Sequence, residues 1–350
     1  MSRDNPINPD HPAFWGQLLM VGIPGPRMDA VARELVRDLK VGGIILFARN
    51  IEGPEQVWEL TRELQHQALA ATGQPLLIAV DQEGGRVQRL KAPFTIIPPA
   101  RELGTTKTPK EVAHLARHVA RELSLVGLNV NLAPVLDVPR SPRCPQWDRA
   151  YGRDPEHVAR FALAAIKGYM SGGIIPVAKH FPGLGDTGVD SHEALPLAQS
   201  GDAERKVDLL PFQQAVAAGV PMVMTAHLQV PEWEARPATL SSVALHNWLR
   251  GRLGFKGVII TDDLEMGAIA TQLSAPQGAK EALASGADLL LICNNWEAAW
   301  DTARLLATEA DLIPRGREAA DRLSSLRETL ITGGSELKMV QEYFGGRTCL

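Results

Sequence analysis

Cysteine is scarce in this 350-residue chain, and its placement excludes several classes of protein. The three cysteines, Cys144, Cys293 and Cys349, are widely spaced and form no CxxC pair. Such a set supports neither a disulfide framework nor a zinc-binding or dithiol redox site. We therefore expect free thiols in the reducing cytoplasm, with Cys293 as a small core residue inside the apolar stretch LLLICNN.

The chain also lacks a strong charge imbalance and long apolar runs. Its formal net charge is −4 and its pI is near 6.2, which gives no reason to expect nucleic acid or an anionic membrane as a partner. No run approaches the roughly 18 to 20 apolar residues that cross a bilayer, and residues 1–16 hold no apolar segment of the length found in secretion signals. We expect a cytoplasmic protein without nucleic-acid or membrane partners.

What the chain does have is a series of short, continuous apolar runs, each followed by Gly, Pro, Asp or Asn and then by a helical pattern. Continuous runs are typical of parallel strands that are covered on both faces. The segment PEQVWELTRELQHQALA illustrates the helical pattern, with a proline in its first turn and apolar residues at spacings of three and four. In order, the runs are QLLMVGI, GGIILFARN, PLLIAVDQEGG, NVNLAPVLDV, IIPVAKHFPG, PMVMTAHLQV, GVIITDDLEM and ADLLLICNN.

Eight strand–helix units in one chain predict an α/β fold of the (β/α)8 TIM-barrel type. We expect a single domain over residues 1–350, with the barrel at about 16–331 and a C-terminal tail at 332–350 that either packs on the barrel or stays loose. An open doubly wound sheet is the alternative, but no GxGxxG motif follows the first strand to support a dinucleotide site.

In a barrel of this type the active site forms at the C-terminal ends of the strands, so polar residues there should converge on one mouth. The sequence places a polar group after six of the eight runs. These residues are Asp81, Asn131, Asp137, Lys179, His180, His227, Asp262, Asn294 and Asn295.

Asp262 directly follows a buried apolar run, so its side chain should stand at the rim of the barrel. A carboxylate there suits a nucleophile that attacks the anomeric carbon of a sugar and stabilises an oxocarbenium-like transition state. The next residue, Asp263, is open to a plainer interpretation as the N-cap of a helix.

The segment AKHFPGLGDTGVDSHEALP, residues 178–196, is too rich in glycine and proline for a helix or a strand, and it reads as a loop that carries chemistry. His192 lies two residues after Asp190, so the carboxylate can hold one ring nitrogen while the other faces a substrate. Without further context, the same pair reads as a surface Asp and His.

Three other strand-end residues also have two interpretations. Lys179 and His180 fit a cation and a donor that grip sugar hydroxyls, or a Schiff-base lysine with its base. Asp81 fits a ligand for two vicinal hydroxyls, or the anchor of a turn. The chain has no HxH or HExxH pattern, and we expect no metal and no organic cofactor.

Several long motifs, in order, resemble glycoside hydrolase family 3, and specifically its single-domain β-N-acetylglucosaminidases. They are GGIILFARNI, AVDQEGGRVQRL, NLAPVLDV, AKHFPGLGDTGVDSHEALP and GVIITDDLEMGAI, and the resemblance runs from about residue 16 to residue 330. It implies retaining hydrolysis of terminal β-linked N-acetylglucosamine without a cofactor. The implied setting is the cytoplasmic recycling of cell-wall peptidoglycan fragments in which this sugar is linked to anhydro-N-acetylmuramic acid.

Residue by residue, the resemblance implies a catalytic set and a sugar-binding set. Asp262 is the implied nucleophile, and His192, paired with Asp190, is the implied general acid/base on a flexible loop. The residues implied to bind N-acetylglucosamine are Asp81, Arg89, Arg149, Lys179 and His180.

Two departures from the family pattern bear on these roles. Leu184 stands where the family loop has a second histidine, so we expect reduced support for the loop. The region DVPRSPRCPQWDRAYGRDP replaces the usual NPVIGDRSFG, which weakens the assignment of Arg149. The arginines of this region suit an anionic leaving group or a solvated basic loop. A phosphorylase that uses phosphate instead of water, a lysine-dependent lyase and a non-catalytic sugar-binding barrel remain the alternative functions.

Overall fold

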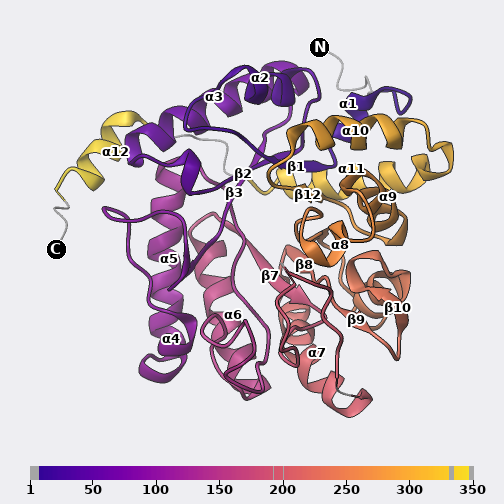
Figure 1. Cartoon of the computed structure of the whole chain (residues 1–350). Coiled ribbons are helices and arrows are strands. Elements are labelled where there is room, and N and C mark those ends of the chain that lie inside the picture. The colour runs from indigo at the N-terminus through magenta and orange to yellow at the C-terminus, as the bar shows by residue number, and fades with distance from the viewer. Residues whose placement is uncertain (1–7, 192, 200, 331–334, 347–350) are drawn as a thin grey trace.

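The computed structural model describes residues 8–191, 193–199, 201–330 and 335–346, and its centre is a parallel eight-stranded sheet that closes into a barrel (Figure 1). The strands follow one another in space in the order β11-β8-β7-β6-β3-β2-β1-β12, and every neighbouring pair is parallel. A parallel bridge between Ile260 and Leu289 joins the two ends of this series. The predicted TIM-type barrel is therefore confirmed, and the open doubly wound sheet is excluded.

All eight predicted apolar runs contain a barrel strand. The strands are shorter than the runs, because the last residues of each run leave the sheet and enter the loops at the mouth. Their bounds are β1 Leu19–Gly22, β2 Gly43–Leu46, β3 Leu77–Val80, β6 Val130–Asn131, β7 Ile175–Phe181, β8 Met222–Thr225, β11 Val258–Ile260 and β12 Leu290–Ile292. Every residue of these strands is buried, as continuous apolar runs predict.

Helices surround the barrel, and several of them begin at residues whose side chains cap them. Thr108 accepts a hydrogen bond from the Glu111 amide while the Glu111 carboxylate accepts one from the Thr108 amide, which forms a capping box before α5. The outer helices are α2 Ala30–Arg37, α3 Pro54–Thr72, α4 Ala100–Thr106, α5 Pro109–Leu125, α6 Pro155–Ser171, α7 Asp202–Ala217, α9 Ala275–Ser285, α10 Trp296–Ala307 and α11 Ile313–Arg327. The segment SSVALHNWLRGRLG contains a π-helix over Val243–Arg252.

Short elements complete the ends of the barrel. Two small hairpins stand at the mouth, one made by β4 Gln82–Gly84 and β5 Val87–Gln88 and the other by β9 Gln229–Val230 and β10 Glu234–Pro237. The remaining short helices are α1 Pro12–Gly16, α8 Gly267–Ala270, α12 Leu337–Phe344 and the 3-10 turns Ala48–Asn50, Ala238–Leu240 and Ala310–Leu312.

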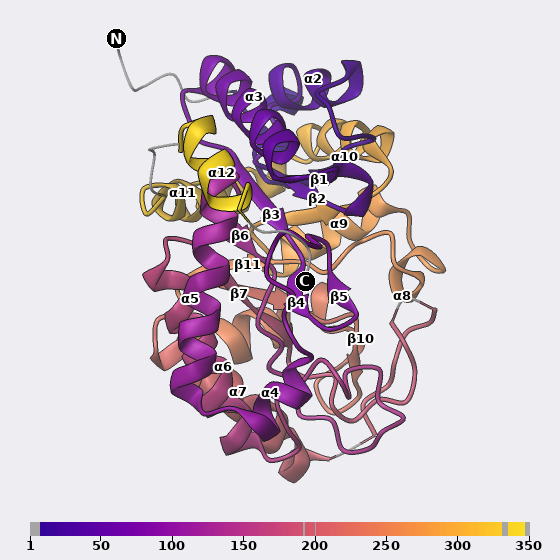
Figure 2. The same cartoon turned by 90° about the vertical axis from the view of Figure 1, so that its left-hand side faces the viewer.

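The C-terminal tail packs on the barrel through α12, which lies beside α3 and α5 (Figure 2). Val340 is fully buried, and the rings of Phe344 and Phe94 have centroids 4.7 Å apart. The indole of Trp58 donates a hydrogen bond to the Ser335 carbonyl at 2.9 Å. Of the two states expected for the tail, the described part shows the packed one.

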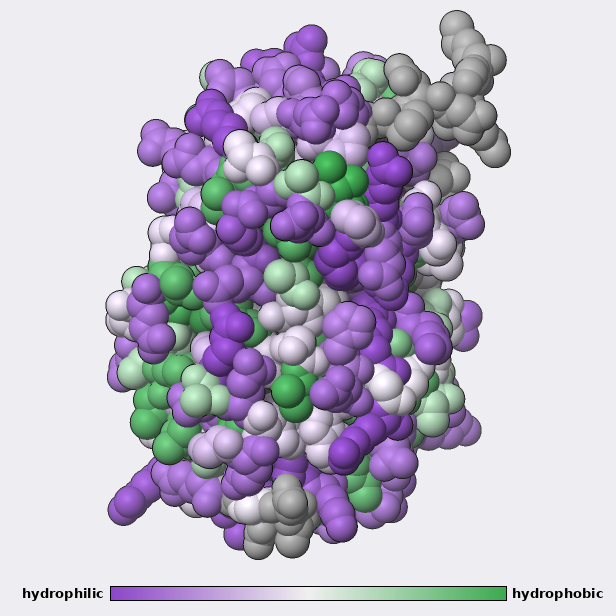
Figure 3. Space-filling view, turned by 90° about the vertical axis from the view of Figure 1, so that its right-hand side faces the viewer, coloured by the Kyte–Doolittle hydropathy of each residue, from purple (hydrophilic) through white to green (hydrophobic). Residues whose placement is uncertain are grey.

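The outer surface is mixed in polarity. On the face that carries α9, α10 and the β9–β10 hairpin, hydrophilic side chains are interrupted by apolar ones that gather toward the mouth (Figure 3). Within residues 8–330 and 335–346, leaving out 192 and 200, no helix combines the length and the apolar character that crossing a bilayer requires.

Candidate active site

Lys179 lies at the centre of a charge cluster at the C-terminal end of the strands. Its ammonium is 2.9 Å from Asp81 at the end of β3 and 2.6 Å from Glu83 in β4. Arg89 approaches Asp81 from the other side at 3.5 Å, and Arg149 forms two hydrogen bonds with Glu83 at 2.8 and 2.9 Å. The structure therefore brings together four of the five predicted sugar-binding residues.

Glu83 is the residue of this cluster that the sequence analysis missed. Burial by itself raises its pKa, but the Arg149 guanidinium and the Lys179 ammonium lower it far below its ordinary value. A signal was present in the sequence: side chains two apart in an extended segment share a face, so Glu83 follows Asp81 on the same side. The ionised carboxylate links Lys179 to Arg149 and fixes both cations.

The electrostatics of Lys179 bear on the lyase alternative. Burial favours the neutral amine, but the carboxylates of Asp81 and Glu83 outweigh burial and raise the pKa of Lys179. A lysine that forms a Schiff base must lose its proton to attack a carbonyl carbon. The surroundings of Lys179 therefore favour a fixed cation and disfavour a nucleophile.

His180, the fifth predicted sugar-binding residue, is held by Asp137. Its Nδ1 is 2.7 Å from a carboxylate oxygen of Asp137, which is fully buried. Because an ionised carboxylate only accepts, Nδ1 carries a proton in this bond. The other ring nitrogen, Nε2, is 3.4 Å from a guanidinium nitrogen of Arg149, so His180 and Arg149 share one wall of the site.

Asp262 follows β11 and its carboxylate accepts a hydrogen bond from the Asp263 amide at 2.9 Å. Burial raises the pKa of Asp262. The imidazoles of His180 and His227 outweigh this and bring the pKa below its ordinary value. Asp262 is thus an ionised carboxylate on which the charge of Lys179 in the charge cluster acts, and ionisation is what the predicted role of nucleophile requires.

Asp263 does not cap a helix, so the plainer interpretation offered for it is wrong. One of its carboxylate oxygens accepts from the amides of Glu265 and Cys293, at 3.1 and 3.3 Å. The next helix, α8, begins four residues later at Gly267. Asp263 instead ties the loop after β11 to the end of β12, and the imidazole of His227 donates to its carbonyl at 2.8 Å.

The loop between β7 and α7 carries the predicted acid/base pair. His192 lies outside the described residues. Asp190 is partly buried, and its carbonyl accepts hydrogen bonds from the amides of Glu193 and Ala194. The adjacent Ser191 is buried, and its carbonyl accepts from the Ala268 amide at 3.2 Å. The residue that precedes His192 therefore contacts α8, which starts five positions after Asp262.

Leu184 does not leave the loop without support, as its departure from the family pattern led us to expect. Its side chain is buried in an apolar cluster with Ala198, Ala226, Leu228 and Val230. Its amide donates to Asp137 at 2.8 Å. Packing and one charge-assisted hydrogen bond thus fix the start of the loop.

The arginines that crowd the region after β6 have separate partners. Arg140 pairs with the buried carboxylate of Asp208 at 2.9 Å, and Arg153 lies over the ring of Trp147 at 5.7 Å. Arg149 points into the site, as described above, and Arg143 is exposed. Only Arg143 and Arg153 are thus exposed in this group, so the region does not present its four arginines as one anion-binding surface.

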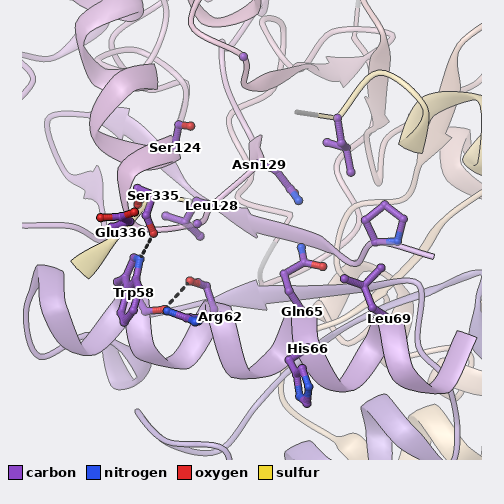
Figure 4. Close-up of a pocket in the computed structure, with 15 residues that line it drawn as sticks. Trp58, Arg62, Gln65, His66, Leu69, Ser124, Leu128, Asn129, Ser335 and Glu336 are labelled. Carbon is purple, nitrogen blue, oxygen red and sulfur yellow. Dashed lines mark hydrogen bonds between the residues drawn. The ribbon is translucent and has the colours of Figure 1, made fainter. Parts of the chain in front are cut away.

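A cavity of about 540 Å³ lies at the other end of the barrel, between α3, the end of α5 and the residues before α12 (Figure 4). Pro75, Asn129 and Gly173 line it just before β3, β6 and β7 begin. The side-chain amide of Asn129 is occupied by backbone groups of Ile78 and Leu76. This cavity is therefore far from the strand ends that carry the charge cluster.

The mouth thus combines an ionised carboxylate with buried cations and hydrogen-bonding groups suited to a carbohydrate, which defines a glycosidase-type barrel. In the described residues, no group of three or more His, Cys, Asp or Glu side chains is arranged to hold a metal ion. The model of the glycosyl hydrolase family 3 N-terminal domain matches residues 14–326. The chain belongs to glycoside hydrolase family 3 and is a glycoside hydrolase.

Relatives of known name agree with this assignment. The chain is 38% identical over 325 residues to a β-hexosaminidase of Nitrosospira multiformis, covering 89% of this chain and 92% of the relative. It superposes with a TM-score of 0.88 and 36% identity on a family 3 β-N-acetylglucosaminidase from Paenibacillus sp. str. FPU-7, covering 95% of this chain and 68% of that one. A β-N-acetylhexosaminidase from Beutenbergia cavernae gives a TM-score of 0.86 at 30% identity, with 93% and 100% covered.

Proposed function

We propose that the protein is a retaining exo-β-N-acetylglucosaminidase that hydrolyses terminal β-linked N-acetylglucosamine from peptidoglycan fragments. The observation that supports this most is the proximity of an ionised Asp262 to the cluster formed around Lys179. The names of the relatives point to the same sugar.

The first chemical step joins the sugar to the enzyme. The Asp262 carboxylate attacks the anomeric carbon while the bond from that carbon to the leaving oxygen breaks. The imidazole of His192 gives its proton to the leaving oxygen, so the departing group leaves as a neutral alcohol. The hydrogen bond between Ser191 and Ala268 supports this role, because it holds the neighbouring residue beside the loop of Asp262.

The second step releases the sugar. The now neutral imidazole of His192 takes a proton from water, whose oxygen attacks the anomeric carbon and displaces Asp262. Two inversions at one carbon retain the β configuration. Asp190 orients the imidazole and stabilises its charged form, which exists before the first step and is restored by the second.

The charge cluster binds the sugar before the cleaved bond. Asp81 has two oxygens that can each accept from one of two vicinal hydroxyls, and Arg89 and Lys179 position that carboxylate. His180 and Arg149 supply ring and guanidinium nitrogens on the adjacent wall. The pairing of these groups with one another keeps the site ordered before substrate arrives.

The natural substrates we propose are fragments in which N-acetylglucosamine is linked β-1,4 to anhydro-N-acetylmuramic acid, with or without peptide, during cytoplasmic recycling of the cell wall. This step rests on the resemblance of the loop and strand motifs to the recycling enzymes of the family. Mass spectrometry of the products from digested cell-wall fragments tests it. Release of free N-acetylglucosamine from the disaccharide supports the assignment, and an untouched disaccharide contradicts it.

A chromogenic β-N-acetylglucosaminide tests the activity itself. We expect turnover with retention, and labelling of Asp262 by a 2-fluoro glycoside. Added phosphate that yields sugar 1-phosphate would instead assign a phosphorylase. Binding of the sugar without turnover would assign a non-catalytic barrel.

A further inference from the structure

One buried carboxylate contacts both the sugar-binding wall and the start of the catalytic loop. One Asp137 oxygen is 2.7 Å from Nδ1 of His180, and the other accepts the Leu184 amide at 2.8 Å. The His180 amide points at this second oxygen as well, at 3.4 Å. Asp137 itself is fully buried, so these protein groups replace the water that an ionised carboxylate needs.

The backbone that leads to this carboxylate is held by the barrel. Just before Asp137, Val135 forms a parallel bridge with Lys179, and the Leu136 amide donates to the Lys179 carbonyl at 2.6 Å. Asp137 therefore extends the edge between β6 and β7 into the mouth. Its position is set from this side by the barrel.

Leu184 is fixed on the opposite side by apolar packing. Its side chain fills the cluster with Leu228 and Val230, and its carbonyl accepts the Thr187 hydroxyl at 2.9 Å. These contacts fix the direction in which the loop leaves the barrel. Any displacement of Leu184 moves a partner of the carboxylate that orients His180.

We propose that Asp137 is a positioning residue that couples the orientation of His180 to the placement of the catalytic loop. It fixes the His180 tautomer with Nδ1 protonated, and through Leu184 it fixes where the segment that carries Asp190 begins. The kinetic test of this inference rests on the proposed function, because it requires turnover. Its binding readout requires only that the site takes N-acetylglucosamine.

The variant Asp137→Asn tests the coupling with little change in volume. An amide offers one accepting oxygen where the carboxylate offers two, so its NH2 group must face either His180 Nδ1 or the Leu184 amide, both of which are donors. We expect N-acetylglucosamine to bind about 10- to 100-fold more weakly, the usual cost of removing an outer partner of a ligand-binding side chain. Calorimetry on the full chain measures this.

The kinetic arm compares two leaving groups. An alkyl β-N-acetylglucosaminide needs a proton on its leaving oxygen, whereas an activated aryl glycoside does not. If Asp137 also places the loop, Asp137→Asn lowers kcat/KM for the alkyl substrate more than for the aryl one. A purely structural role would lower the melting temperature and leave this ratio unchanged.

Two further variants keep the test decisive. Leu184→Gly removes the packing and frees the backbone, and we expect at least about threefold weaker sugar binding with the same change in substrate ratio. Val112→Ala, in α5, is the matched control: it removes two methyl groups from the main core and not from the Leu184 cluster, so it should lower stability but leave affinity and ratio at wild-type values.

Wild-type affinity and an unchanged ratio in Asp137→Asn overturn the inference. If that variant does not fold, the same result in Leu184→Gly overturns it. A wild-type enzyme that turns over no β-N-acetylglucosaminide refutes the proposed function instead. In that case, weaker sugar binding by Asp137→Asn still supports the positioning of His180.

Discussion

Lys179 and Glu83 form a 2.6 Å ion pair in which both side chains are almost completely buried, at 3% and 5% exposure. A lone charge at this depth would be strongly destabilised, so each group depends on the other. The pair joins β7 to the β4–β5 hairpin and gives the mouth a fixed pattern of charge. Several measurable consequences depend on this pattern and on the carboxylates around it.

Replacing the proposed nucleophile gives the largest kinetic effect. For Asp262→Ala we expect kcat to fall at least about 10³-fold, because no carboxylate remains to form the glycosyl-enzyme. Steady-state kinetics with an aryl β-N-acetylglucosaminide measure the loss. Asp301→Ala is the matched control, because that carboxylate is 63% exposed on the outer surface, and it should keep wild-type kcat. An Asp262→Ala enzyme with near wild-type turnover would refute the nucleophile.

Glu83→Gln should destabilise the fold in a pH-dependent way. Breaking a buried ion pair costs about 3–5 kcal/mol, because Lys179 and Arg149 lose their shared carboxylate. The folded pKa of Glu83 lies below its ordinary 4.5, so its contribution is complete above pH 4.5 and declines as the pH falls toward the folded pKa. Denaturant titrations from pH 6 to pH 3 should therefore show a steeper loss for the wild type than for Glu83→Gln. Parallel curves would contradict this.

The difference in stability between the wild type and Asp263→Asn should change with pH in the opposite direction to that for Glu83→Gln. Burial raises the pKa of Asp263 from 3.8 to about 6, so the folded state binds more protons than the unfolded state between these values. The wild type therefore loses stability, at most about 3 kcal/mol, as the pH rises through this window. Asn keeps an oxygen for the amides of Glu265 and Cys293 but does not ionise. The difference between the two denaturation curves isolates this one titration, and its absence would count against the assigned burial effect.

The packing of α12 predicts a stability effect without a kinetic one. Phe344 is buried against Phe94 on the outer side of the barrel, where α12 lies beside α3. For Phe344→Ala we expect a loss of about 3 kcal/mol in the free energy of unfolding, in the range for a buried aromatic ring, with kcat and KM unchanged at 25 °C. Thermal denaturation and kinetics on one preparation check both halves. A change in KM would show that the tail reaches the site through Gln88 of β5, whose side chain donates to the Thr95 carbonyl beside Phe94 at 3.2 Å.

The barrel was predictable because its strands are continuous apolar runs, a pattern set by burial on both faces. The strand-end rule alone predicts Asp81, Asp137, Lys179, His180 and Asp262 at the mouth. That rule uses only the direction of parallel strands, and it needs no knowledge of pairing between side chains.

Pairing between side chains was what the sequence did not reveal. Glu83 lies in β4, beyond the end of the barrel strand β3, and its partners come from β7 and the region after β6. Their contact therefore depends on how the loops fold back. Leu184 was misjudged for the same reason: its support comes from Leu228 and Val230, which are remote in sequence. The role of Asp263 was predicted wrongly because aspartate is common both as a helix N-cap and as a residue that joins two loops. Only the residue at which α8 begins distinguishes the two roles.

The far end of the loop between β7 and α7 is attached differently from its start. Leu197 bridges Gln229, and the Ala198 amide donates to the Gln229 carbonyl, so the attachment is made by main-chain atoms. Main-chain pairing tolerates most changes of side chain. Mutagenesis libraries between these two anchorages that keep Asp190, Ser191 and His192 can therefore vary the loop while the barrel goes on folding as before. This makes the stretch the natural place to engineer new selectivity for the leaving group.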